Sequence, residues 1–163
     1  MKIEHALEKE NHFELALSGS IDEDAEFNAI PKIQKNLLVV DFSQVTMINS
    51  CGIRDWVNWT KTLDSNVQVH IKKCPKFIID KINILQVFLP AKSLVLSFYT
   101  PYYCENCDSE KQYLFERGVH FQEQTADKAA FVDYDLEVLC DQCKTAMSMD
   151  VITEKYFNFL GVK

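Results

Sequence analysis

Residues 37–63, LLVVDFSQVTMINSCGIRDWVNWTKTL, join an apolar run to a polar turn and then to a segment with helical periodicity. The run from Leu37 to Val40 is typical of a short strand buried on both faces. Asp41 to Ser43 interrupts the run, so we expect the strand to end there. From Ser50 onward, apolar residues recur at helical spacing: Ile53, Trp56, Val57 and Leu63. The stretch therefore predicts a strand, a turn and an amphipathic helix.

The residues at the start of this helix suit a tight junction between the turn and the helix. Asn49 and Ser50 both favour the N-cap position, because their side-chain oxygens can accept from exposed N–H groups of the first turn. Gly52 lets another part of the backbone approach closely.

The flanking segments alternate between strand-like and helix-like patterns. Strands are predicted at Lys2–Leu7, Phe13–Leu17, Val67–Ile71 and Ser93–Tyr99. Helices are predicted at Asp22–Ile33 and from Cys74-Pro75 to a stop at Pro90. This alternation indicates an α/β fold, with a mixed sheet and helices mainly on one face.

Composition and charge restrict the class of protein. The chain has 163 residues, of which 47% are apolar and 25% charged, as in ordinary globular proteins. The opening Met-Lys-Ile-Glu-His is not followed by an apolar stretch, and charges interrupt residues 77–98. We therefore expect a cytoplasmic protein without a secretory signal or membrane span. The net charge of −7 lies mostly after residue 98, which argues against nucleic acid as a partner.

Four of the six cysteines form two Cys-x2-Cys pairs, Cys104/Cys107 and Cys140/Cys143. Each two-residue loop can present two thiolates together, and four sulfurs complete a tetrahedral zinc site. With every position filled by sulfur, the Zn²⁺ is expected to be structural. Two disulfides, or His120 as a substitute ligand, are the alternatives. We expect a β-rich, four-cysteine module that resembles a zinc ribbon, with a C-terminal helix, at residues 99–163, docked on the preceding domain.

Two motifs in residues 1–98 resemble those of STAS domains, the family of anti-sigma-factor antagonists and of the cytosolic tails of sulfate transporters. Val39-Val-Asp-Phe-Ser-x-Val-x-x-Ile-Asn-Ser-Cys-Gly-Ile53 is similar to the family's central segment, an apolar strand followed by Asp-Leu-Ser and Asp-Ser-Ser-Gly. Leu15-Ala-Leu-Ser-Gly-Ser-Ile-Asp22 is similar to its Leu-x-Gly-x-Ile-Asp strand end. The resemblance implies a STAS-like domain over residues 1–98.

The resemblance also places a partner-docking and switch loop at Asn49, Ser50, Cys51 and Gly52. In the antagonists, the residue before the glycine is a serine that a partner kinase phosphorylates. Here that position is Cys51, which a serine kinase cannot phosphorylate, and Asn49 replaces the usual Asp. Ser50 is the neighbouring candidate for phosphorylation, although helix capping is its more ordinary role.

The sequence therefore favours a non-enzymatic regulatory module that binds another protein in a bacterial cytoplasm. The resemblance implies an anti-sigma-factor kinase or a signalling scaffold as the partner. The alternative is a thiol-based redox sensor that uses Cys51, at a helix N-terminus, or the zinc thiolates. The four histidines show no metal-pair spacing, and no glycine-rich phosphate loop is present, so an enzyme is not expected.

Overall fold

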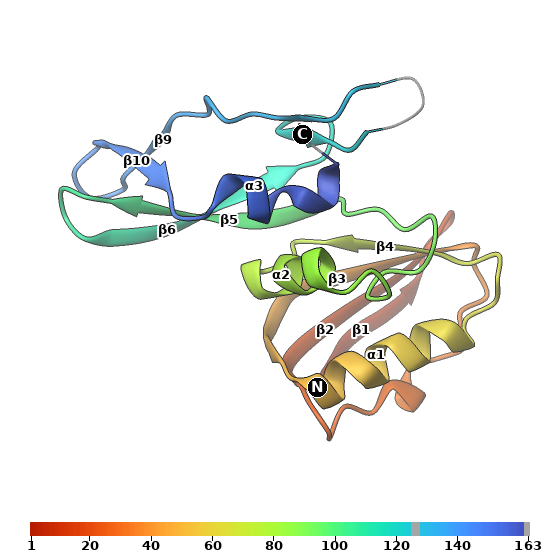
Figure 1. Cartoon of the computed structure of the whole chain (residues 1–163). Helices are drawn as coiled ribbons and strands as arrows, with labels where there is room; N and C mark the ends of the chain where they lie inside the picture. Colours follow the sequence, from red (N-terminus) through yellow and green to blue (C-terminus); the bar gives the residue numbers. More distant parts are fainter. Residues whose placement is uncertain (125–127, 162–163) are drawn as a thin grey trace.

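The computed structural model describes residues 1–124 and 128–161, which form two sheet-based modules side by side (Figure 1). The N-terminal elements are β1 (Lys2–Glu8), β2 (Phe13–Ile21), the 3₁₀ helix η1 (Phe27–Ala29), β3 (Leu37–Ile48), α1 (Ser50–Thr62), β4 (Gln68–Lys72) and α2 (Lys76–Ile84). The C-terminal elements are β5 (Ser97–Cys104), β6 (Ser109–Glu116), β7 (Phe121–Gln122), β8 (Phe131–Val132), β9 (Val138–Leu139), β10 (Ala146–Met149), α3 (Thr153–Tyr156) and the 3₁₀ helix η2 (Asn158–Leu160). The predicted α/β class is confirmed at this level.

The N-terminal sheet has the strand order β1-β2-β3-β4, with β1 antiparallel to β2 and the other pairs parallel. Helices α1 and α2 lie on one side of it (Figure 1). Trp56 of α1 is fully buried there, with its ring 5.5 Å from that of Phe42 on β3. Its indole N–H donates to the carbonyl of Phe88 at 2.8 Å, so this large side chain is buried with its polar group satisfied.

Residues 22–33 do not form the predicted helix, and only Phe27–Ala29 make a single 3₁₀ turn. The side chain of Asp22 accepts from the N–H of Asp24 at 3.2 Å, a local turn that competes with helix formation. Phe27 stacks on Trp59 of α1, with ring centroids 5.6 Å apart. The apolar side chains of this segment are therefore buried by contact with α1 rather than along a helical stripe.

Two other predicted boundaries are also wrong. Strand β3 does not end at Asp41–Ser43 but continues to Ile48. Helix α2 ends at Ile84, well before Pro90, and Phe88 is buried in the turn that follows. In both cases contacts with distant residues decide the boundary: Asp41 pairs with lysines that follow it in the chain, and Phe88 accepts a hydrogen bond from Trp56. The local sequence pattern does not show these contacts.

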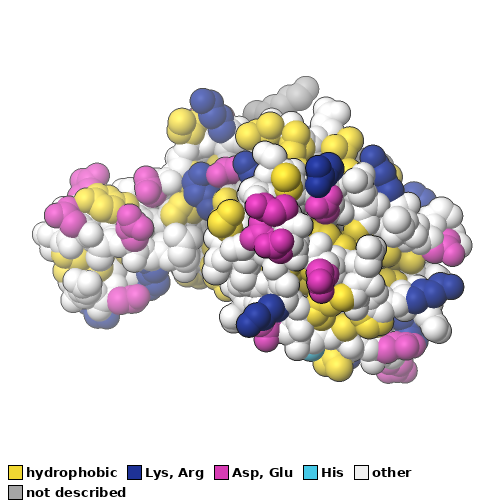
Figure 2. Space-filling view, turned by 90° about the horizontal axis from the view of Figure 1, so that it is seen from below, with side chains coloured by type: hydrophobic (Ala, Val, Ile, Leu, Met, Phe, Trp, Pro, Cys, Tyr) yellow, Lys and Arg dark blue, Asp and Glu magenta, His cyan; other side chains and the backbone are white. Residues whose placement is uncertain are grey.

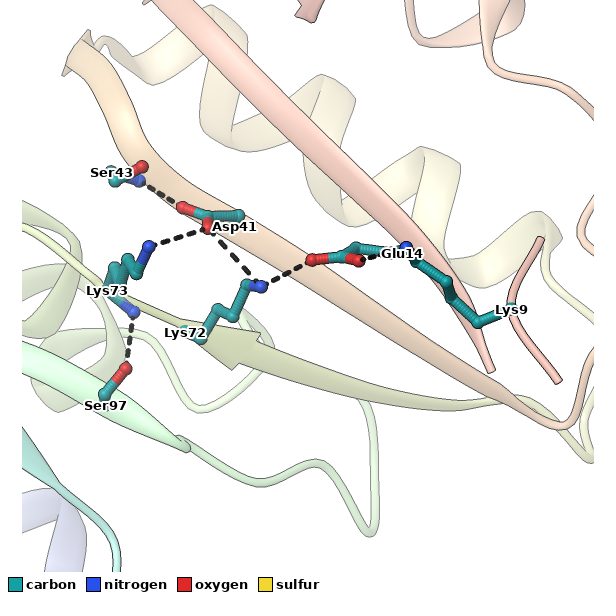
Figure 3. A network of polar contacts seen from close by, with 7 residues as sticks. All are labelled: Lys9, Glu14, Asp41, Ser43, Lys72, Lys73 and Ser97. Carbon is teal, nitrogen blue, oxygen red and sulfur yellow. Dashed lines mark hydrogen bonds and ion pairs between the residues drawn. The ribbon is translucent and has the colours of Figure 1, made fainter. Parts of the chain in front are cut away.

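Asp41 remains inside β3 because its carboxylate is paired on the side of the sheet away from α1 (Figure 3). It accepts from the N–H of Ser43 at 2.9 Å and lies 3.5 Å from the Lys72 ammonium and 3.6 Å from that of Lys73. Lys72 also reaches Glu14 on β2, at 2.5 Å. The three parallel strands are thus connected by charges as well as by backbone hydrogen bonds.

Strand β5 links the two modules. Before and at its start, the chain forms a parallel ladder with the end of β4, in which the N–H of Leu96 donates to Ile71 at 2.7 Å. The N–H of Cys74 donates to the backbone carbonyl of Ser97 at 3.1 Å next to it. Farther along, β5 is the inner strand of the second sheet, whose order is β6-β5-β10-β9. The two sheets are separate, but the isolated bridges Ile71–Val95 and Cys74–Phe98 join them.

A second aromatic core lies at the junction of the modules, with Phe98 of β5 at its centre. Its ring contacts five others, at centroid distances of 4.9–6.0 Å: Phe115, Phe121, Tyr156, Phe157 and Phe159. Asn83 of α2 donates to the carbonyl of Tyr156 at 2.9 Å and accepts from the N–H of Phe159 at 2.8 Å. The C-terminal segment is therefore fixed to both β5 and α2.

Among the described residues, no helix has the length and apolarity needed to cross a membrane.

Helix α1 begins in direct contact with the end of β2. A Cβ atom at Gly52 would lie 2.1 Å from the carbonyl oxygen of Ile21, a distance that no side chain tolerates. We expect Gly52→Ala to lower the free energy of unfolding by about 3 kcal/mol or more, because backbone must move. Urea unfolding monitored by circular dichroism measures this. Asn58→Ala, on the exposed side of the same helix, is the control, and equal stability of the two variants would contradict the close contact.

The Asp41 network predicts a pH-dependent contribution to stability. Burial opposes its ionisation, but the hydroxyl and N–H of Ser43, with Lys73 and Lys72, lower the pKa of this carboxyl below its usual value. A depressed folded-state pKa stabilises the fold above the unfolded value of about 4, and this contribution is lost as the pH falls through the folded value. Asp41→Asn should therefore be less stable than wild type at pH 7, by a margin that narrows from about pH 5 downward.

Urea unfolding midpoints of both proteins across this pH range test the prediction. Asp135→Asn, at an exposed position, is the control for the loss of one carboxylate. A margin between wild type and Asp41→Asn that stays constant with pH would contradict it.

Candidate metal centre

The four paired cysteines come together at the end of the C-terminal module farthest from α1. Their Sγ atoms all lie within 4.8 Å of one another. Cys104 ends β5 and Cys140 follows β9, while Cys107 and Cys143 lie in the adjoining turns. The shortest sulfur–sulfur distances are 3.4 Å for Cys104–Cys143, 3.4 Å for Cys107–Cys140 and 3.7 Å for Cys107–Cys143.

These distances fit a metal chelate rather than disulfides. All six cysteines of the chain are free, and a disulfide would require sulfurs about 2.05 Å apart. Four sulfurs about 2.3 Å from a central ion in tetrahedral geometry lie about 3.8 Å from one another. The cluster is close to this spacing and includes two sulfurs from each pair. It can therefore bind one metal ion.

The two Cys-x2-Cys turns have the same local structure. Cys104 is paired with Ser109 across the first turn, and the N–H of Cys140 donates to the carbonyl of Thr145 at 2.9 Å across the second. The residue after each second cysteine has a left-handed backbone, with φ of 52° at Asp108 and 61° at Lys144. Each turn thus folds back on itself and points both of its sulfurs to one side.

Two hydroxyl groups contact the cluster from equivalent positions in the two turns. Ser109 Oγ lies 3.2 Å from the sulfur of Cys107 and 3.2 Å from that of Cys140. Thr145 Oγ1 lies 3.4 Å from the sulfur of Cys143. The sequence-based prediction missed both residues. The available signal is the likeness of two hexapeptides, CENCDS and CDQCKT, which share acidic, amide and hydroxyl residues at matching positions.

The surroundings of the cluster favour the thiolate at two of its cysteines. The hydroxyl and backbone N–H of Thr145 lower the pKa of the Cys143 thiol to about 5. The backbone N–H of Cys143 lowers the pKa of Cys140. The hydroxyl of Ser109 lowers the pKa of Cys107, but hydrogen bonding with Cys140 and burial outweigh it and raise that pKa to about 12. Because the thiolate is the metal-binding form, Cys140 and Cys143 are the thiols most readily available to a cation.

His120 is not part of the cluster. Its Nδ1 accepts from the backbone N–H of Glu116 at 3.1 Å, and its ring lies edge-on to Tyr113 at 5.6 Å. The histidine therefore closes the turn after β6, and the group of four cysteines is complete without it.

The predicted docking loop is held in a defined shape between β3 and α1. Asn49 caps α1, with its Oδ1 accepting from the Gly52 N–H at 2.9 Å. Its Nδ2 donates to Glu23 at 2.8 Å, and its backbone N–H donates to Ile21 at 3.1 Å. An aspartate here would repel Glu23, so the asparagine matches its surroundings.

The side chains of this loop differ in accessibility. Ser50 is exposed, and Cys51 is half-buried. Met47, at the end of β3, is 45% exposed and adds an apolar side chain beside the loop. Cys74, in contrast, is fully buried, and burial raises the pKa of its thiol well above the usual value. Of the two cysteines outside the cluster, Cys51 is therefore the accessible one.

Comparisons of this chain with protein-family models, with curated proteins and with solved structures find no match.

Proposed function

We propose that this chain is a non-enzymatic protein-binding module with a structural zinc ion, and that it regulates its partner as STAS-domain antagonists do. The zinc ion holds the two cysteine turns together. The loop Asn49–Gly52 and helix α1 dock on the partner. The cluster of four sulfurs within 4.8 Å is the observation that carries the proposal.

The composition of the cluster supports a structural role for the metal. Four thiolates are the donor set of structural zinc sites, and they leave no position for water or substrate. The second turn, with Cys140 and Cys143, is flanked by short strands, with two residues in β9 and four in β10. So small a sheet gains little from its own pairing, and the bound ion stabilises it by linking turns that are distant in sequence.

The loop before α1 supports docking rather than catalysis. Its backbone is fixed by the three hydrogen bonds of Asn49 and by the contact of Gly52 with Ile21, so little ordering is needed on binding. Exposed Ser50 and Met47 offer polar and apolar contacts side by side.

The regulatory part of the proposal rests on the resemblance of residues 1–98 to STAS domains, whose two motifs lie at the end of β2 and from β3 to the start of α1. On this proposal the partner is an anti-sigma-factor kinase or a signalling scaffold. With cysteine at the position of the usual phosphoserine, release of the partner does not depend on phosphorylation of that residue.

Metal analysis tests the zinc proposal. We expect one zinc ion per full-length chain by elemental analysis, and its loss from a Cys104→Ser/Cys140→Ser variant, which removes one ligand from each turn. The variant should also unfold at a lower temperature. Cys51→Ser, outside the cluster, is the control and should retain the metal. A folded wild-type protein without metal would refute the proposal.

Charge placed in the loop tests the docking surface. Cys51→Glu should abolish recovery of the partner when the tagged protein is purified from its own cells. Gln112→Glu, at an exposed position on β6 of the other module, adds the same charge away from the loop and α1 and should recover it unchanged. Equal recovery with both variants would exclude the loop as the contact. Rapid reaction of Cys51 with thiol reagents in the metal-loaded protein would instead favour the thiol-based sensor.

A further inference from the structure

The hydroxyl groups of Ser109 and Thr145 are directed to sulfur. Within the part of the chain that the structure describes, Ser109 Oγ contacts the sulfurs of Cys107 and Cys140 and can donate to either. Thr145 Oγ1 contacts the sulfur of Cys143, from which it accepts. Hydroxyls that stabilise turns usually bond to nearby backbone groups. Turn formation alone therefore does not explain these side chains.

The repetition of this arrangement is a second, independent observation. Ser109 and Thr145 each stand two residues after the second cysteine of a turn and pair with its first cysteine across that turn. The position just before each hydroxyl residue is not alike in the two turns, since Asp108 and Lys144 have opposite charges. A hydroxyl in the same place on both turns points to a common task at the metal.

We infer that Ser109 and Thr145 are positioning residues for the metal ligands, with Ser109 donating a hydrogen bond to the ligand thiolates, and that the two residues set how tightly the ion is held. This inference rests on the proposed zinc site. Four thiolates around a dication leave two negative charges, and an O–H donor aimed at sulfur offsets part of that charge. It also makes the sulfur a poorer nucleophile.

Ser109 has the larger role of the two. It touches one sulfur from each turn, so its single proton can be donated to either turn, and its loss affects ligands on both. Thr145 touches a sulfur of its own turn only. Groups that hydrogen-bond to metal ligands contribute about 10- to 100-fold to metal affinity, and we expect Ser109→Ala to fall in this range. Thr145→Val should have a smaller effect.

The experiment uses the full-length chain loaded with Zn²⁺ or Co²⁺. Competition with a chromogenic chelator gives the zinc affinity, and the sulfur-to-cobalt charge-transfer band reports electron density on the thiolates. Alkylation kinetics of the loaded protein report sulfur reactivity. Ser109→Ala and Thr145→Val should bind zinc more weakly, shift the band and react faster. Ser109→Thr and Thr145→Ser, which retain a hydroxyl, should restore wild-type values.

Ser148→Ala, an exposed serine on β10 of the same sheet, is the control for a general loss of stability and should leave all three readouts unchanged. Unchanged affinity, band and reactivity in both hydroxyl-free variants would overturn the inference, as would equal changes in Ser148→Ala. If wild type binds no metal, the proposed zinc site itself fails, which is a distinguishable result.

Discussion

Strand β5 is the element on which both modules depend. Near its start, Ser97 and Tyr99 are hydrogen-bonded to Cys74, two residues after the end of β4, and its last residue, Cys104, belongs to the cysteine cluster. Between these points, the ring of Phe98 lies at the centre of the second aromatic core. The strand therefore pairs within the second sheet and is also fixed to the chain that leaves the first sheet.

The metal cluster and the aromatic core lie at opposite ends of the C-terminal module, and each stabilises its own end. The core near Phe98 is large and is fastened to α2 through Asn83. The opposite end projects from the body as a lobe with acidic side chains on its surface (Figure 2). Besides the eight-residue β5 and β6, it contains only the short strands β9 and β10 of the described residues. The four sulfurs lie at this end, where a bound ion would link turns that are distant in sequence.

Some of this arrangement could be predicted from the sequence, and the reasons differ by element. Helix α1 and the four cysteines were predictable because helical periodicity and a two-residue spacing are local properties. Residues 22–33 were mistaken for a helix because Asp22 or Asp24 suits a cap and Pro31 a stop, whereas Asp22 forms a local turn and Phe27 packs on Trp59 of α1. Asp41 looked like the end of a strand because its lysine partners lie on β4 and just after it. Neither Ser109 nor Thr145 alone can be recognised in the sequence as a contact of the cluster. Their shared position becomes visible only when the two cysteine turns are aligned.

The continuity of β5 has a mechanical consequence. Eight residues at about 3.3 Å each make a strand about 26 Å long, paired on both sides for part of its length. Force applied to the projecting lobe acts along this strand, and the hydrogen bonds of Ser97 and Tyr99 to Cys74 pass it to the chain that leaves β4. β4 is parallel to β3, and α1 follows β3 directly. A load on the lobe is therefore carried by backbone hydrogen bonds toward the sheet that carries α1.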